Sequence, residues 1–148
     1  MGARIVRGAG RPVALAVVTL ALAACGGTSP QEAASGDDDL AGRAFVSTRV
    51  TGRDLVEGTE VRLIFQEGRV SVTAGCNTLN GEAAWEDGRL VVQGPMAQTM
   101  MACDPALSEQ DVWLAALLTS EPPLTLDGST LTLGEASESS VGIMFAEQ

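Results

Sequence analysis

The sequence predicts a mainly β (α+β) fold: a small antiparallel sheet or open barrel of about 7–9 short strands, with one covering helix near residues 105–119. Three observations lead to this prediction. Short apolar runs with a period of two are separated by Glu-Gly and Asp-Gly pairs, one longer stretch has helical spacing, and 45% of the 148 residues are hydrophobic. That share is enough for the core of one small domain.

The strand predictions depend on alternation and on turn residues. Residues 61–66 alternate between the two faces of a strand, stop at Glu67-Gly68 and resume at 69–74, as expected for a hairpin with one buried face. The pairs Asp87-Gly88 and Asp127-Gly128 predict two further hairpin turns. Strands are therefore expected at residues 43–50, 61–66, 69–74, 83–85, 90–92, 124–126, 131–133 and 141–145.

One helix interrupts the strands. Asp104-Pro105 predicts an N-cap followed by a proline in the first turn, and Glu121-Pro122-Pro123 predicts the end of the helix. We expect Trp113 and Leu117 to lie mainly under this helix, against the sheet. The apolar positions at helical spacing are Leu107, Leu114, Leu117 and Leu118, with Trp113 on the flank.

The N-terminus has the organisation of a secretory signal. Three arginines precede a short apolar run at residues 13–22, and the stretch ends in Leu22-Ala23-Ala24-Cys25. The apolar run is too short to cross a bilayer as a helix. Leu-Ala-Ala-Cys resembles the bacterial lipobox, which implies cleavage before Cys25 and a lipid on Cys25; the alternative is an ordinary signal peptide followed by a chance cysteine. We therefore expect an exported protein, lipid-anchored at the cell membrane on the extracytoplasmic side.

The chain divides by composition into three parts. Residues 1–24 are predicted to be a lipoprotein-type signal peptide, residues 25–39 a flexible tether, and residues 40–148 the folded domain. The acidic run at 37–39 lacks the regularly spaced oxygens of a calcium loop, so a solvated linker is the better interpretation. The formal net charge of −10 disfavours nucleic-acid binding.

Several short motifs occur in an order that resembles a known family, the META domain or HslJ-type heat-shock lipoprotein family. The resemblance covers about residues 40–146, and Phe45 stands where the family often has tryptophan. The motif residues are Gly75-Cys76-Asn77, Gly81, Met100-Met101-Ala102-Cys103, Glu109, Trp113-Leu114 and Leu131-Thr132-Leu133.

The resemblance implies a small, mostly antiparallel β domain with one prominent helix, commonly exported and associated with envelope stress and, in some bacteria, with novobiocin tolerance. It implies no enzymatic activity. Gly75, Asn77, Gly81 and Met101 are the family-motif positions to which we assign a structural role.

The chain contains three cysteines. Lipidation of Cys25 leaves the pair Cys76 and Cys103 in a compartment where disulfides persist, so we predict a bridge between them. The alternative is a pair of buried thiols that behave as small hydrophobic groups. A metal site is not predicted, because two cysteines in a chain without histidine do not make a tetrahedral ligand set.

Other polar and soft residues have both functional and structural interpretations. Asn77 and Asn80 could bind a polar ligand, but we expect them to satisfy backbone groups in the tight turn from Gly75 to Gly81. The methionines could line a ligand groove, but methionine more often fills gaps in a core. The methionines concerned are Met96, Met100, Met101 and Met144.

The sequence supports no catalytic residues and no cofactor. Histidine is absent, and the serines have no activating base beside them. Two hypotheses remain for function. The first is a non-catalytic, membrane-anchored binding or structural module in envelope stress protection, with an envelope protein as the possible partner. The alternative is a carrier of a small hydrophobic ligand, which requires a cavity of several hundred Å³ under the helix.

Overall fold

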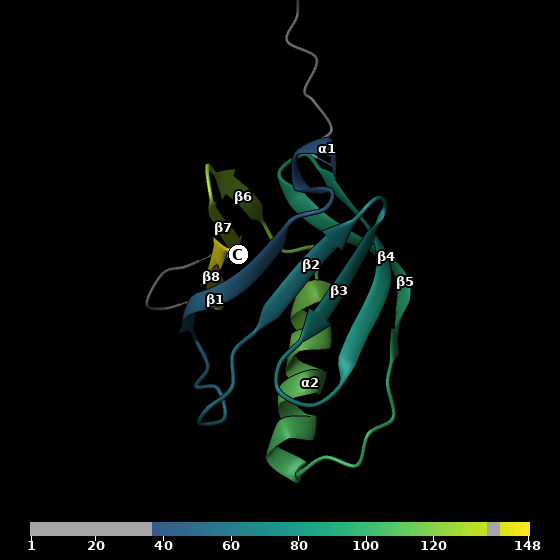
Figure 1. Ribbon diagram of the computed structural model, residues 1–148, viewed down its shortest axis with the longest axis vertical. Helices are drawn as coiled ribbons and strands as arrows, with labels where there is room; N and C mark the ends of the chain where they lie inside the picture. The colour runs from purple at the N-terminus through teal and green to yellow at the C-terminus, as the bar shows by residue number, and fades with distance from the viewer. Residues whose placement is uncertain (1–36, 136–139) are drawn as a thin grey trace, which may run out of the picture. The chain divides into compact units, whose positions relative to one another are not determined.

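The computed structural model describes residues 37–135 and 140–148, which belong to one compact unit, Glu32–Gln148. Cys25, the predicted signal peptide and most of the predicted tether lie outside the described residues. Eight antiparallel strands curl into a half-barrel with one long helix beside it (Figure 1). The elements are α1 (Asp37–Leu40), β1 (Ala44–Thr51), β2 (Arg62–Gln66), β3 (Arg69–Thr73), β4 (Thr78–Glu86), β5 (Arg89–Gln98), α2 (Pro105–Leu118), β6 (Leu124–Asp127), β7 (Thr130–Gly134) and β8 (Gly142–Glu147).

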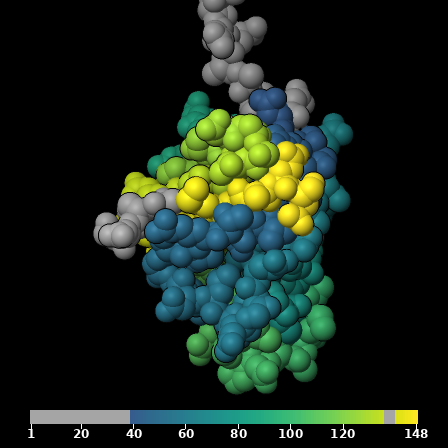
Figure 2. Space-filling model, turned by 60° about the vertical axis from the view of Figure 1, so that its left-hand side comes forward, coloured from purple at the N-terminus to yellow at the C-terminus, as the bar shows by residue number. Residues whose placement is uncertain are grey.

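The strand order is β5-β4-β3-β2-β1-β8-β7-β6, so the first and last strands pair in the middle of the sheet. Figure 2 shows this arrangement on the surface, with β8 (yellow) between β1 (blue) and the β6–β7 hairpin (yellow-green). The two edge strands also meet at one end, because the Leu90 amide donates to the Pro122 carbonyl at 3.0 Å and the Leu124 amide to the Gly88 carbonyl at 2.8 Å. The predicted open barrel is thus a sheet whose edges touch only at that end.

The predicted turns form because their residues accept a left-handed backbone. Asp87 and Gly88 have φ values of 49° and 73° and join β4 to β5, as an Asp-Gly hairpin requires. Strand β5 extends beyond the predicted residues 90–92, through Gly94 and Pro95, to Gln98. The register with β4 shifts opposite Gly81, which is the behaviour of a bulge in an edge strand that tolerates proline.

The interior of the sheet is filled by side chains. Phe45, Leu63 and Phe145 have no exposed surface, and the rings of Phe45 and Phe65 meet edge to face with their centroids 6.0 Å apart. A cavity bordered by Leu40, Phe65 and Leu90 has a volume of only about 10 Å³. That is room for about one water molecule.

Helix α2 begins at the predicted proline and ends at Leu118, but its buried face differs from the prediction. Leu114 and Leu118 are fully buried, together with the polar residues Gln110 and Asp111. Trp113 and Leu117 pack against the core but are only partly buried, so the prediction that they lie mainly under the helix holds only in part. The physical reason is that the stripe passing through positions 110, 111, 114 and 118 faces the sheet, which turns Trp113 and Leu117 to its flank.

The start of α2 also differs in one detail. Asp104 precedes the helix as predicted, but its side chain makes no capping hydrogen bond. Its backbone carbonyl instead accepts from the Ser108 amide at 3.0 Å, and Pro105 occupies the first turn.

The acidic run at 37–39, predicted to belong to the flexible tether, forms the short helix α1 instead. Leu40, which ends α1, is only 2% exposed.

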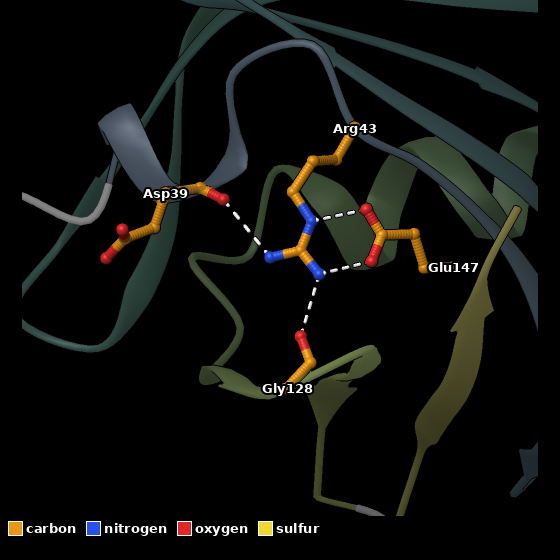
Figure 3. Close-up of polar contacts among 4 residues, drawn as sticks. All are labelled: Asp39, Arg43, Gly128 and Glu147. Carbon is orange, nitrogen blue, oxygen red and sulfur yellow. Dashed lines mark hydrogen bonds and ion pairs between the residues drawn. The ribbon is translucent and has the colours of Figure 1, made fainter.

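An ion pair joins the beginning of the domain to its end, and Figure 3 shows its contacts. Arg43 donates from Nε to Glu147 Oε1 at 2.7 Å and from Nη2 to Glu147 Oε2 at 2.6 Å. The same guanidinium donates to the carbonyls of Asp39 at 3.2 Å and Gly128 at 2.7 Å. We call these four residues the Arg43 clasp. The Arg43 hydrogen bonds lower the pKa of the Glu147 carboxyl, and bonding to Glu147 raises the pKa of Arg43.

Within residues 37–135 and 140–148, no helix is long and apolar enough to cross a membrane.

Candidate functional site at the disulfide corner

The two motif stretches identified in the sequence meet at one corner of the fold. Cys76, in the loop between β3 and β4, and Cys103, in the loop before α2, form a disulfide with their Cα atoms 6.2 Å apart. The predicted bridge is therefore present in the structure. The two cysteines are 27 positions apart, the segment between them contains β4 and β5, and Asp104 alone separates Cys103 from the start of the helix. We call the disulfide and the residues that are hydrogen-bonded beside it, Asn77, Thr99, Met101 and Asp111, the disulfide corner.

Asn77 is the centre of this corner and is only 5% exposed. Its Oδ1 accepts from Thr99 Oγ1 and from the Met101 amide, both at 3.0 Å. Its Nδ2 donates to Asp111 Oδ2 at 2.9 Å and to Cys103 Sγ at 3.2 Å. Every polar atom of this side chain thus bonds within the protein, which fits a structural role for Asn77 better than recognition of a ligand.

Asp111 is the residue that sequence reasoning missed. It lies on the buried face of α2 with no exposed surface, and its Oδ2 also accepts from the Asn77 backbone amide at 3.1 Å. Its other oxygen, Oδ1, has no hydrogen-bond partner among the described residues. A signal was present in the sequence, because Asp111 stands at helical spacing between Leu107, Leu114 and Leu118, where an apolar residue would be expected.

Gln110, beside Asp111, attaches the helix to two other segments. Its Oε1 accepts from the Val56 amide at 2.7 Å, and its Nε2 donates to Thr59 Oγ1 at 3.0 Å and to the Ala74 carbonyl. The helix is therefore bonded through buried polar side chains to the loop before β2 and to the end of β3. Such bonds in a water-poor interior fix one orientation of the helix.

The motif glycines leave room for close packing near this corner. Gly75 has a φ of 108°, and a Cβ built there would lie 2.7 Å from Thr59 Cγ2, so a side chain would meet both backbone strain and a clash. At Gly81 a Cβ would lie 3.2 Å from Val92 Cγ1 and 3.3 Å from Met96 Cγ. Both positions thus match the structural role assigned to them.

The methionines divide into two groups. Met96 packs partly against the core, whereas Met100 and Met101 are 96% and 63% exposed. The expectation that they fill core gaps is wrong for these two residues. They lie in the loop from β5 to α2, and the Met101 backbone amide bonds inward to Asn77 while both side chains face solvent.

The outer side of α2 forms a shallow, open depression of about 450 Å³. The guanidinium carbon of Arg53 lies 5.2 Å from the centre of the Trp113 ring, a cation–π distance. Val112, which is 67% exposed, borders the same depression. The lining residues are Arg53, Ser108, Glu109, Val112, Trp113 and Ala116.

A curled antiparallel sheet, one long helix beside it and a disulfide between the loops that precede β4 and α2 define the protein as a small, disulfide-linked, mainly β domain. The family model of the META domain matches residues 38–148, so the chain belongs to the META domain family. The resemblance stated from the motifs is thereby confirmed, and the HslJ-type label agrees with it.

Two solved structures are similar in fold. One, an NMR structure, is 25% identical, covers 74% of this chain and 92% of its own, and has a TM-score of 0.57. The second is an NMR structure of a protein from Burkholderia xenovorans, 19% identical, covering 76% and 86% of the two chains, with a TM-score of 0.57. No curated protein matches this chain. Both similarities are similarities of fold, and neither indicates an activity.

Proposed function

We propose that this META domain protein is exported, anchored to the cell membrane by a lipid on Cys25, and acts in envelope stress protection by binding a protein partner and not by catalysis. One observation carries the binding part of the proposal. Met100 and Met101 present two large apolar side chains to solvent from a loop that the disulfide and Asn77 hold in place. Exposed methionines on an ordered loop are suited to contact varied protein surfaces.

The filled interior favours this proposal over the carrier hypothesis. A carrier needs an enclosed cavity of about 300 Å³ or more, whereas the pocket beside Phe65 holds only about 10 Å³, and under the helix Leu114 and Leu118 are fully buried. The larger depressions are open surface features, such as the one bordered by Trp113. We therefore keep the interaction module as the proposed function.

A pull-down tests the partner-binding proposal. The full chain is used as bait on detergent-solubilised envelope, and Met100→Ser/Met101→Ser is compared with the wild type. Ile64→Ser is the matched control, because Ile64 is also an exposed apolar residue, at 36%, but lies on β2. The proposal expects a captured protein that the double variant loses and the control keeps. Equal capture by all three baits would reject the methionine loop as the binding surface.

The anchor requires a separate experiment. Since Leu22-Ala23-Ala24-Cys25 resembles a lipobox, Cys25→Ala is expected to release the protein from the membrane fraction or to leave the precursor uncleaved. Fractionation followed by an immunoblot measures both outcomes. A variant of normal mature size that stays fully in the membrane fraction would sink the lipid-anchor proposal.

A further inference from the structure

The disulfide corner brings together three side chains of types that bind metals, two cysteines and one aspartate. The Sγ atoms of Cys76 and Cys103 and a carboxylate oxygen of Asp111 all lie within 4.8 Å of one another. The sequence alone offered only the two cysteines as ligands. The fold adds the carboxylate by placing the buried face of α2 against the loop that carries Cys76.

The orientation of the Asp111 carboxylate supports this grouping. Oδ2 is occupied by two N–H donors of Asn77, at 2.9 and 3.1 Å. Oδ1 has no partner among the described residues, although the whole residue has no exposed surface. An unpaired oxygen on a buried carboxylate is costly, and a cation bound to it would remove that cost.

Asn77 is hydrogen-bonded to candidate metal ligands without being a ligand itself. It donates both to Asp111 Oδ2 and to Cys103 Sγ, so it touches two of the three candidate ligands. Hydrogen bonds of this kind orient metal ligands and leave their remaining electron pairs directed at the metal.

From these contacts we infer that reduction of the Cys76–Cys103 disulfide converts the corner into a site for a borderline-soft divalent cation such as Zn²⁺. The ligands are the two thiolates and a carboxylate oxygen of Asp111, and the fourth tetrahedral position is left to water. The inference does not depend on the partner-binding proposal, because it concerns other atoms.

The reduction step needs a thiol reductant. Two reductant thiols give up two electrons and become a disulfide, the bond between Cys76 and Cys103 breaks, and the two protons finish on the two cysteine sulfurs. Binding of the cation then releases both protons to solvent, because thiolates are the ligands. Both cysteines are half-buried, so a reductant has partial access to the bond.

Metal titration of the full chain tests the inference. The protein is purified in detergent with Cys25→Ser in every sample, so that the third cysteine cannot supply a ligand. Dithiothreitol reduces it and is removed under argon, and Zn²⁺ binding is measured by competition with a chromophoric chelator. We expect one Zn²⁺ per reduced chain and no competition from the oxidised chain. In the reduced chain, Co²⁺ should give a thiolate charge-transfer band in the near ultraviolet.

Two variants test whether Asp111 binds the cation as a ligand or acts only through its negative charge. Asp111→Asn is expected to weaken Zn²⁺ binding by about tenfold or more. Glu109→Gln is the matched control, since Glu109 lies on the same helix but is exposed, and it should bind like the wild type. Wild-type affinity in Asp111→Asn, equal binding by oxidised and reduced protein, or no binding after reduction would each overturn the inference.

X-ray absorption keeps the test decisive if Asp111→Asn fails to fold. The Zn²⁺-loaded, reduced wild type should show two sulfur neighbours at about 2.3 Å and two lighter neighbours at about 2.0–2.2 Å. A shell of four sulfurs, as in a site shared between two chains, or a shell without sulfur would contradict the proposed ligand set.

Discussion

The disulfide corner and the Arg43 clasp are both polar, and their hydrogen bonds have similar lengths, but they differ in burial. Asn77 and Asp111 are 5% and 0% exposed, whereas the side chains of Arg43 and Glu147 keep 22% and 32% of their surface in solvent. The corner ties the helix to two loops, and the clasp ties the first described residues to the last strand and the β6–β7 turn.

The comparison shows that the length of a hydrogen bond does not by itself determine how much the bond contributes to the free energy of unfolding. A buried polar group that loses its partner keeps the full cost of desolvation, whereas water and salt replace much of an exposed ion pair. We therefore expect changes around the disulfide corner to alter the free energy of unfolding much more than changes in the clasp.

Leu114→Ala should give the largest effect, because Leu114 is fully buried one turn after Asp111 and holds the helix on the sheet. The expected loss in free energy of unfolding is about 2–5 kcal/mol. Leu117→Ala is the matched control on the flank of the same helix, and it should cost clearly less. Urea titration of both variants checks this, and equal midpoints would contradict the assigned buried face.

Loss of the disulfide should give the second-largest decrease in the free energy of unfolding. Reduction of the wild type, or the double variant Cys76→Ser/Cys103→Ser, is expected to lower the free energy of unfolding by about 2–4 kcal/mol, because a closed loop in the unfolded chain is opened. Thermal unfolding with and without reductant measures the change. The double variant serves as the control, since reductant should leave its melting temperature unchanged. A wild type that melts identically after complete reduction would show that packing alone holds the corner.

The hairpins and the helix were predictable because their signals are local. Glu67-Gly68, Asp87-Gly88 and Asp127-Gly128 specify turns within a few residues, and Pro105 specifies where α2 begins. The lengths were less well predicted where distant contacts decide them. Strand β5 passes Gly94 and Pro95 because β4 continues to pair with it beyond the bulge.

The candidate site was predictable only in part, for a related reason. Cysteine counting and the motif resemblance led to Cys76, Asn77 and Cys103, but Asp111, which lies 34 residues from Asn77, was not among the candidates. Its role follows from the direction in which the helix faces, which no local pattern specifies. The same dependence explains why Trp113, whose ring lies under the Arg53 guanidinium, is less buried than expected.

The clasp should give the smallest effect, and one that depends on pH. Arg43 lowers the pKa of Glu147 in the folded protein, so the pair stabilises the fold above the ordinary glutamate pKa of about 4.3, and this contribution disappears as the pH falls through the lowered value. Glu147→Gln should thus be slightly less stable than the wild type at neutral pH and equal to it in strong acid. Melting curves across this range provide the measurement, and a difference that grows towards acid pH would contradict the assignment.

Asn77, which belongs to the first motif stretch, joins the two stretches into one closed corner by bonding to Met101 in the second and to Asp111. Hydrogen exchange of the Met101 backbone amide is the most direct test of this role. This amide lies in a loop outside the strands and helices, and the Met101 side chain is 63% exposed, so exchange would be fast without the bond to Asn77 Oδ1. We expect slow exchange of the Met101 and Asn77 amides in the oxidised protein, and loss of protection at Met101 in Asn77→Ala. Exchange of the Met101 amide at the rate of an unstructured loop in the oxidised wild type would contradict it.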